Sequence, residues 1–202
     1  MKVIESVQLS ARSDVGLVRE NNEDSVGWNG WLANDSGKVS RQQTLKLSTI
    51  SPIVAVVADG MGGHRAGEIA SGLAVDRLTS TPWPNGGHSD IEQALHDAAV
   101  AAHAEIDRQA LDNLEYFGMG STLAGVLLTP TTVYHCNVGD SRIYRYREQT
   151  MTQLSTDDCP GMGRSHVLTQ ALGGNRIPTP HLGQMPAQAG DRLLLCSDGL
   201  TD

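Results

Sequence analysis

Cysteine is scarce in this sequence, and its spacing does not match a disulfide framework or a zinc site. Cys136, Cys159 and Cys196 are the three cysteines among 202 residues, and no two of them form a CxxC pair. Cys136 and Cys196 stand inside apolar runs, where a thiol packs as a small hydrophobic side chain. The spacing therefore argues against structural disulfides and against a cysteine zinc site.

Basic residues are also in short supply. Lys and Arg number 15 against 23 Asp and Glu, so the formal net charge is −8, and the basic residues form no run. Binding to a nucleic-acid backbone depends on clustered Lys and Arg, so the composition predicts no nucleic-acid partner. The acidic surplus has two interpretations, which are solubility and, where carboxylates cluster, cation binding.

Long apolar stretches are missing as well. The N-terminal residues lack the apolar core of a signal peptide, and no segment is long and apolar enough to span a membrane. We therefore expect a cytoplasmic protein with no membrane partner. With 202 residues, the chain is expected to form one domain over residues 1–202.

Hydrophobic patterns predict a buried strand and two long helices. Residues 53–58 are β-branched and apolar on both faces, which is typical of a central strand. A helix is expected from about Ala66, because apolar residues follow at helical spacing. Ser89 and Glu92 form a capping-box pattern that predicts the start of a second helix, which ends near residues 111–114.

Turn signals and short runs predict a largely antiparallel sheet. Asn29-Gly30 is a strong hairpin signal, and residues 32–48 are expected to form a polar surface excursion. A short helix is expected from His166 to Leu172. Strands alternate with the two long helices in a pattern that indicates an α+β fold. The further strands are expected at residues 7–18, 122–128, 132–138, 141–147, 151–154 and 192–197.

An aspartate beside a glycine closes three apolar strands, at Asp59, Asp140 and Asp198. A carboxylate at the end of a buried strand is costly to desolvate unless it is paired. Hard cations such as Mg²⁺ take carboxylate and carbonyl oxygens as ligands. Each aspartate alone is better explained as a turn former. Three of them on strong strands, together with Glu23-Asp24, favour a shared divalent-metal site that hydrolyses a phosphate ester.

The remaining polar signals are weaker. Arg19 is the candidate phosphate contact because its planar fork suits two phosphate oxygens, although taken alone it fits a surface salt bridge better. The glycines of residues 60–63 lack the Lys and Ser/Thr that end a P-loop. His64 is a candidate proton donor or a solvated loop histidine. No serine stands in a nucleophile elbow, so metal-activated water is the simpler nucleophile.

Six stretches of the chain resemble, in the same order, the metal-dependent protein phosphatases of the 2C type, and in particular bacterial serine/threonine phosphatases. One such stretch would be weak evidence, whereas the ordered set is specific and covers nearly the whole chain. The six stretches are residues 19–24, 57–63, 118–122, 138–142, 168–173 and 196–202.

The resemblance implies a fold, a reaction and a set of partners. The fold is a four-layer α-β-β-α sandwich of two mostly antiparallel sheets flanked by helices, C-terminally incomplete in this chain. The reaction is hydrolysis of phosphoserine and phosphothreonine by metal-activated water, with two catalytic Mn²⁺ or Mg²⁺ ions, a third weaker ion and no phosphoenzyme. The partners are phosphorylated proteins, the substrates of a bacterial Ser/Thr kinase in signal transduction.

The matching positions also imply roles for individual residues. Arg19, Asp59 and Asp198 are expected to be catalytic, with Arg19 binding the phosphate of the substrate. Asp140 and Asp202 match the third, weaker metal site. Asp24 is expected to contact the metal ligands without binding a metal itself. The full set of implied metal ligands is Glu23, Asp59, the carbonyl of Gly60, Asp140, Asp198 and Asp202.

The sequence departs from the family pattern in several places. Relatives continue past the position of Asp202 to a later metal-binding aspartate, so we expect this chain to lack that segment and one ligand. Met61 stands where many relatives have a histidine general acid, which leaves the acid unassigned. Residues 155–164 are short where relatives often carry a flap, and Gln170 replaces a common arginine. Two alternatives follow, which are an impaired metal-binding docking module and a phosphatase of small phosphate esters.

Overall fold

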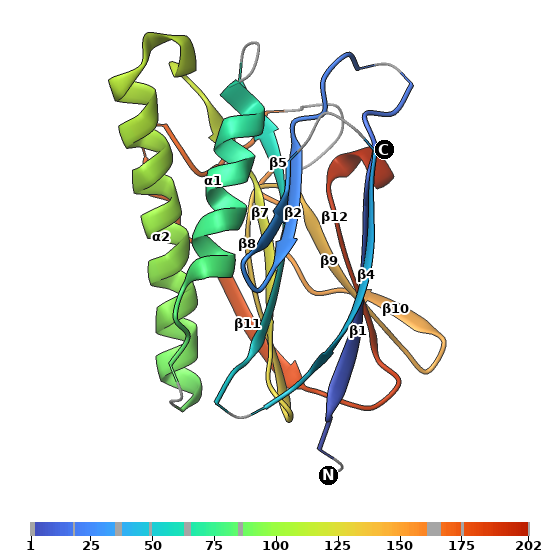
Figure 1. The fold of residues 1–202 in the computed structure, drawn as a ribbon. Coiled ribbons are helices and arrows are strands. Elements are labelled where there is room, and N and C mark those ends of the chain that lie inside the picture. Colours follow the sequence, from blue (N-terminus) through green and yellow to red (C-terminus); the bar gives the residue numbers. More distant parts are fainter. Residues whose placement is uncertain are drawn as a thin grey trace.

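Two long helices, a seven-stranded sheet and a second layer of strands make up the chain in the computed structural model (Figure 1). Five strands come first along the chain, both long helices follow between the fifth and sixth strands, and the remaining strands come after them. The structure describes residues 3–17, 19–34, 38–48, 50–62, 66–84, 87–160, 167–174 and 176–201.

The main sheet is antiparallel and has β5 (Ile53–Met61) near its centre. β5 pairs with β2 (Asp24–Trp28) on one side and with β7 (Leu123–Leu128) on the other. The remaining strands of this sheet are β3 (Trp31–Ala33), β6 (Gly120–Ser121), β8 (Thr132–Val138) and β11 (His181–Pro186). The strand order is β11-β8-β7-β5-β2-β3, and β6 extends the pairing at the end of β5.

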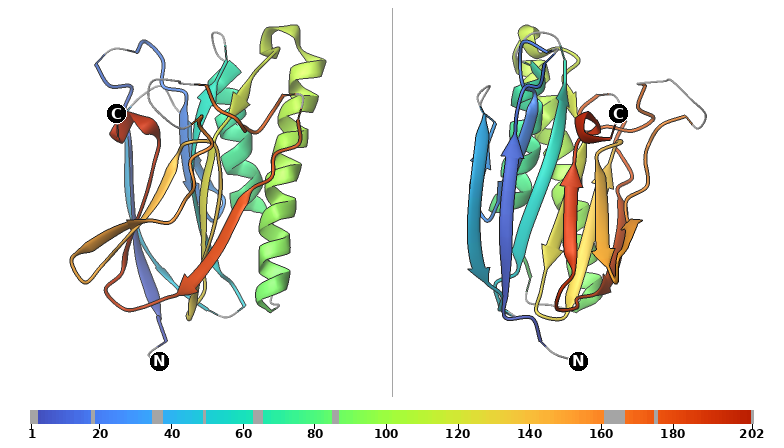
Figure 2. Two further views of the ribbon diagram at one scale, coloured as in Figure 1. Left: turned by 180° about the vertical axis from the view of Figure 1, so that it is seen from behind. Right: turned by 90° about the vertical axis from the view of Figure 1, so that its right-hand side faces the viewer.

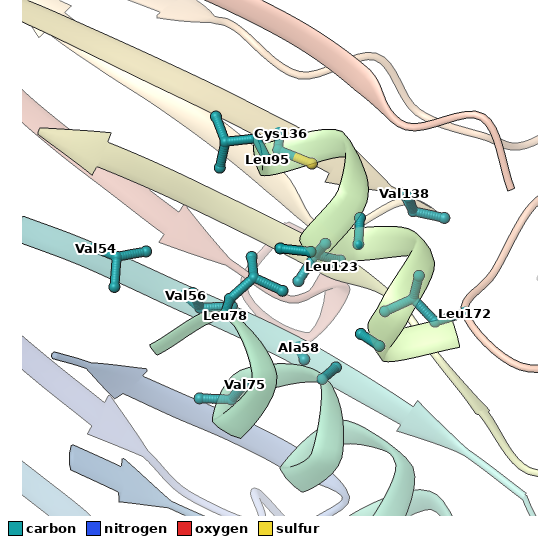
Figure 3. Packing of buried hydrophobic residues seen from close by; sticks show 14 of the residues in the cluster. Val54, Val56, Ala58, Val75, Leu78, Leu95, Leu123, Cys136, Val138 and Leu172 are labelled. Carbon is teal, nitrogen blue, oxygen red and sulfur yellow. The ribbon is translucent and has the colours of Figure 1, made fainter. Parts of the chain in front are cut away.

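Both long helices, α1 (Ala66–Ser80) and α2 (His88–Asp112), cover the same face of this sheet (Figure 1). Alternate side chains of a strand point to opposite faces, so every second residue of β5 reaches the helices. The helix-side core includes Val54, Val56 and Ala58 of β5 together with Val75 and Leu78 of α1 (Figure 3). A short 3₁₀ turn, η1 (Leu114–Tyr116), follows α2. Among the helices that the structure describes, none is long and apolar enough to cross a membrane.

A second β layer packs on the opposite face of the main sheet (Figure 2). It contains the pair β1 (Ser6–Ser13) and β4 (Val39–Lys46), and a three-stranded sheet in the order β10-β9-β12. The bounds of these three strands are Thr150–Gln153 for β10, Arg142–Arg147 for β9 and Arg192–Cys196 for β12. The core between the two layers includes Ile53, Val126, Ile143 and Leu195.

The predicted α+β sandwich is confirmed, and its described layers run in the order helices, sheet, sheet. The hairpin at Asn29-Gly30 is confirmed, because β2 and β3 pair across it and the two turn residues have φ values of 42° and 78°. The central strand, α1, the strands of the meander and the last strand are also present. The first strand ends at Ser13, earlier than predicted.

Two strands, β4 and β11, were not predicted from the sequence, because their residues do not form a clear apolar pattern. The predicted surface excursion over residues 32–48 is wrong, because β4 lies there and pairs with β1 along its whole length. Most of β4 is exposed, and its sequence is accordingly polar. β11 also has no predicted counterpart, since it is an edge strand with alternate residues exposed and a proline at its end.

Two local predictions about helices are wrong. The described residues of the predicted helix from His166 to Leu172 are not helical, and His166 itself lies outside the described residues. Leu172 instead forms a β-bridge with Ser121, and Gly173 then turns the chain with φ 82°. The Ser89–Glu92 capping box is also wrong, because α2 begins at His88 and the Gly87 N–H donates to Asp90 Oδ2 at 3.0 Å.

Replacing Asp191 by Asn should lower the stability of the folded chain in a pH-dependent way. Arg147 donates two hydrogen bonds of 2.6 Å to the Asp191 carboxylate, which holds the pKa of that carboxyl below its usual value. A depressed carboxyl pKa stabilises the fold above the unfolded pKa, and this stability is lost as pH falls through the folded pKa. At pH 7 the variant should lose about 2 kcal/mol, measured by urea unfolding without metal.

The difference in free energy of unfolding between the two proteins should narrow as pH falls through the lowered pKa of Asp191, because the wild-type carboxylate then also takes up a proton. A difference that is the same at pH 7 and at low pH would show that the ion pair does not carry the effect.

Candidate metal centre

Three segments far apart in the sequence meet at one end of the main sheet (Figure 1). Asp24 opens β2 and lies opposite Asp59 of β5 in the antiparallel register. Asp198 follows β12 as the first residue of a short 3₁₀ turn, η2 (Asp198–Leu200). Ser197 Oγ donates to Asp24 Oδ2 at 2.7 Å and so joins the end of β12 to the start of β2.

Burial and crowding by like charges raise the pKa of Asp59 to about 8. Burial is the largest cause, and the charges of Asp24, Asp198 and Asp140 act in the same direction. A hydrogen bond between the carboxyl groups of Asp59 and Asp198 raises it further. The fold therefore gathers four aspartates into one cluster, three of which are the strand-ending aspartates of the sequence.

Glu23 and Arg19 lie beside this cluster. Burial raises the pKa of Glu23, the positive charge of Arg19 lowers it, and the charges of Glu68 and Asp24 raise it. The pKa of Asp24 is likewise raised by burial, against the hydrogen bond from Ser197, which lowers it. Arg19 is exposed, so its guanidinium is accessible to an anionic group that arrives from solvent.

Hydroxyl groups hold the backbone of Asp59 in place. The Asp59 N–H donates to Thr122 Oγ1 at 2.9 Å, and the Thr122 N–H donates to the Asp59 carbonyl at 2.8 Å. Ser121 Oγ donates to the same carbonyl at 3.1 Å. Thr122 Oγ1 also shares a hydrogen bond of 2.6 Å with Ser141 Oγ, next to Asp140. These hydroxyls are buried and serve the backbone, which agrees with the absence of a nucleophilic serine in the motifs.

Two glycines allow the first turn of α1 to approach the cluster. A Cβ on Gly60 would lie 1.9 Å from the carbonyl oxygen of Gly67, and a Cβ on Gly67 would lie 2.5 Å from Glu23 Oε1. The Glu23 carbonyl accepts hydrogen bonds from the Gly60 N–H at 3.1 Å and from Ser71 Oγ at 2.6 Å. Larger residues would separate β5, α1 and Glu23, so the glycines fix the carboxylate of Glu23 beside the end of β5.

The donor chemistry of the cluster fits a divalent cation. In the described ranges, no three His, Cys, Asp or Glu side chains already stand in a metal-binding group, so ion binding requires the carboxylates to close in. Besides burial, the groups that shift the pKa values of Asp24 and Asp59 most are neighbouring carboxylates and the hydroxyl of Ser197. Carboxylate oxygens are the ligands that Mg²⁺ and Mn²⁺ prefer, and such an ion would offset the mutual repulsion.

Some predicted site residues stay outside this geometry. Asp202 and His64 lie outside the described residues. The roles as metal ligands of Glu23, Asp59, the Gly60 carbonyl, Asp140 and Asp198 remain predictions, as do the role of Arg19 as the phosphate contact and that of Asp24 beside the ligands. Thr122, Ser197 and Asp158 were assigned no role from the sequence, although Thr122 and Ser197 lie within two of the six stretches. A hydroxyl residue inside such a stretch is the signal that could have found Thr122 and Ser197, whereas no signal in the sequence marks Asp158.

Comparison with known proteins identifies the family. A family model described as "Protein phosphatase 2C" matches residues 36–202. The serine/threonine phosphatase Stp of Listeria innocua is 35% identical, over 95% of this chain and 77% of the relative. The serine/threonine protein phosphatase PstP of Mycobacterium tuberculosis is 34% identical over 97% of this chain, which spans only 37% of that relative's length.

A solved structure agrees with the fold and with the chemistry of the cluster. It is the catalytic domain of the phosphatase PstP in complex with two manganese ions, and it is 32% identical to this chain with a TM-score of 0.75. The similarity covers 98% of this chain and 79% of that one. Sequence, fold and carboxylate cluster all agree, and the chain belongs to the protein phosphatase 2C family.

Proposed function

We propose that the chain is the catalytic part of a metal-dependent protein serine/threonine phosphatase. The observation that carries the proposal is the cluster of Asp24, Asp59, Asp140 and Asp198, in which the charges of the other three carboxylates raise the pKa of Asp59. Such an arrangement is unfavourable on its own and favourable around divalent ions. The exposed Arg19 beside it offers a fork for a phosphate group.

Two cations would be held by Glu23, Asp59, Asp198 and the Gly60 carbonyl, and a third by Asp140 and Asp202. When bound, Mn²⁺ or Mg²⁺ ions supply positive charge that activates water and neutralises a phosphoryl group.

The chain's own residues position these groups. Thr122 fixes the backbone of Asp59 through two hydrogen bonds, and Ser197 orients Asp24 between the ends of β2 and β12. Arg19 binds two oxygens of the substrate's phosphate and orients the phosphorus toward the carboxylate cluster. The charge of Arg19 also helps to stabilise the phosphoryl group during its transfer.

Phosphorylated proteins are the proposed substrates, in keeping with the names of the relatives in Listeria innocua and Mycobacterium tuberculosis. A bacterial Ser/Thr kinase as the opposing enzyme, a role in signal transduction and a cytoplasmic location stay predictions from the sequence. The comparisons do not favour a catalytically impaired docking module. Relative rates on phosphopeptides and on small phosphate esters distinguish a protein phosphatase from a phosphatase of metabolites.

The wild-type chain should release phosphate from p-nitrophenyl phosphate and from phosphothreonine peptides only when Mn²⁺ or Mg²⁺ is present. Asp59→Asn should reduce this rate at least about a hundredfold, because it removes the carboxylate charge at the centre of the cluster. Wild-type activity that persists unchanged in excess chelator would refute the metal-dependent reaction.

The same Asp59→Asn substitution should make the metal-free protein more stable. It removes a carboxyl group whose pKa is raised to about 8 by burial and by neighbouring carboxylates, so the folded state no longer carries that cost. In EDTA at pH 7, the Tm should rise by several degrees, whereas Asp191→Asn should lower it. The stabilisation by added Mn²⁺ should shrink in Asp59→Asn, because the gain in stability from a ligand grows with the logarithm of its affinity for the folded protein. An unchanged response to Mn²⁺ would exclude Asp59 from the site.

Arg19→Ala should lower kcat/KM on phosphopeptides by about tenfold to a hundredfold, because a charged phosphate contact is lost. The Tm should stay within about one degree of the wild type, since Arg19 is exposed. Arg12→Ala is the matched control, because Arg12 is an exposed arginine on β1 whose nearest carboxylate partner, Asp14, is 3.9 Å away. Equal losses in both variants would mean that general surface charge, not Arg19, attracts the substrate.

A further inference from the structure

Asp158 is a buried carboxylate that connects three segments of the chain behind the aspartate cluster. Only 6% of the surface of Asp158 is exposed to solvent. Asp158 Oδ2 accepts a hydrogen bond from the Gly139 N–H at 2.9 Å. Asp158 Oδ1 accepts from Gln170 Nε2 at 2.9 Å and from His181 Nε2 at 2.8 Å. Because the ionised carboxylate only accepts, His181 carries its proton on Nε2 in this contact.

Asp158 holds the peptide groups on both sides of Gly139. The Asp158 N–H donates to the Gly139 carbonyl at 3.0 Å, while its side chain takes the Gly139 N–H. Gly139 has φ 91°, and a Cβ there would lie 2.8 Å from Cγ2 of Thr122. The turn that carries Asp140 is therefore clamped between Asp158 and Thr122, and Thr122 also holds the backbone of Asp59.

The segment before Asp158 is anchored along the same strands. The side chain of Asn137 donates to the Thr156 carbonyl at 2.7 Å and accepts from the Thr156 N–H at 3.2 Å. Ser155 Oγ accepts from the Ile143 N–H at 3.0 Å. This anchorage fixes Asp158 relative to β8 and β9, so its side chain is a rigid reference for the turn between them.

The other two partners of Asp158 tie it to the chain that enters β11. Gln170 Oε1 accepts from the Thr179 N–H at 2.7 Å, and His181 is the first residue of β11. The Thr169 N–H donates to the Asp158 carbonyl at 2.8 Å. Gln170 stands where the family commonly has an arginine. Here its side-chain amide and the His181 ring both donate hydrogen bonds to the Asp158 carboxylate.

We propose that Asp158 is a positioning residue that sets Asp140 in its metal-binding place by holding the Gly139 peptide, an inference that rests on the proposed function. Asp140 is close enough to Asp59 for its charge to be felt there, so a displaced 139–140 turn alters the geometry of the cluster. Asp158 acts through the backbone of the preceding turn, where it accepts the hydrogen bond from the Gly139 N–H. His181 and Gln170 keep the Asp158 carboxylate oriented toward Gly139.

Asp158→Asn tests the proposal because an amide cannot replace the carboxylate at this position. Asn offers one acceptor oxygen, whereas Asp158 uses both oxygens for donors on opposite sides. Either the Gly139 N–H or the Gln170 and His181 donors must then face an NH₂ group. Calorimetric titration of the metal-free chain with Mn²⁺ should show the weakest detectable site about tenfold weaker than in the wild type, as for other residues that orient metal ligands.

Two further readouts separate positioning from general destabilisation. Amide hydrogen exchange at Gly139 and Asp140 should speed up in Asp158→Asn, and kcat should recover at saturating Mn²⁺ while the Mn²⁺ concentration for half-activity rises. Asp191→Asn is the matched control, since Asp191 is a partly buried carboxylate that also accepts from one backbone N–H and pairs with Arg147. It lies at the start of β12, at the other end from Asp198, and should leave Mn²⁺ affinity unchanged.

Each outcome decides the proposal. Mn²⁺ affinity and Gly139 exchange equal to the wild type in Asp158→Asn would overturn the role of Asp158 alone, even if the Tm falls. A wild-type chain that binds no Mn²⁺ would overturn the proposed function itself.

If Asp158→Asn does not fold, His181→Leu replaces it. This variant keeps the contact between Asp158 and Gly139 but removes one donor that orients the Asp158 carboxylate, and a severalfold weaker Mn²⁺ site is expected. His181→Gln restores a donor and should rescue the affinity, and equal behaviour of the Leu and Gln variants would also overturn the proposal.

Discussion

Repulsion among crowded carboxylates at one end of the main sheet is the constraint on which the other features of the site depend. Asp24 and Asp59 face each other across β2 and β5, and Asp198 and Asp140 reach the same place from β12 and from the turn after β8. Removing an ionised carboxylate from water costs several kcal/mol unless an opposite charge is near. The pKa of Asp59, raised to about 8, records this cost. A protein keeps such an arrangement where its function needs it, and a divalent cation relieves it.

The fold holds the carboxylates together by constraining the backbone beneath them. Glycines at positions 60 and 67 bring α1 and β5 close enough for Glu23 to lie beside the cluster. Thr122 connects the Asp59 backbone to the turn that carries Asp140, and Asp158 holds the other side of that turn. These contacts lie between segments distant in sequence, so the site is rigid only when the whole sandwich is formed.

The sequence allowed the cluster to be predicted because three of its four aspartates follow strongly apolar runs, and because the ordered stretches are specific to one family. The sequence did not reveal β4 and β11, since edge strands with one exposed face have the polar composition of loops. The predicted helix before Gly173 failed because a long-range bridge from Leu172 to Ser121 overrides local helical preference. The role of Asp158 was also beyond the sequence, because its partners lie 19, 12 and 23 residues away along the chain. Contacts of this kind become visible only in three dimensions.

The most direct test of the account is to locate Mn²⁺ by anomalous diffraction in crystals of the chain grown with the ion. The carboxylates should close around the metal, and the strongest anomalous peaks should lie between Asp59 and Asp198, with Glu23 at the edge of the same site. A weaker peak should lie beside Asp140. Crystals that contain ample Mn²⁺ but show no anomalous density within coordination distance of Asp59 would contradict the central claim that this carboxylate cluster is a metal centre.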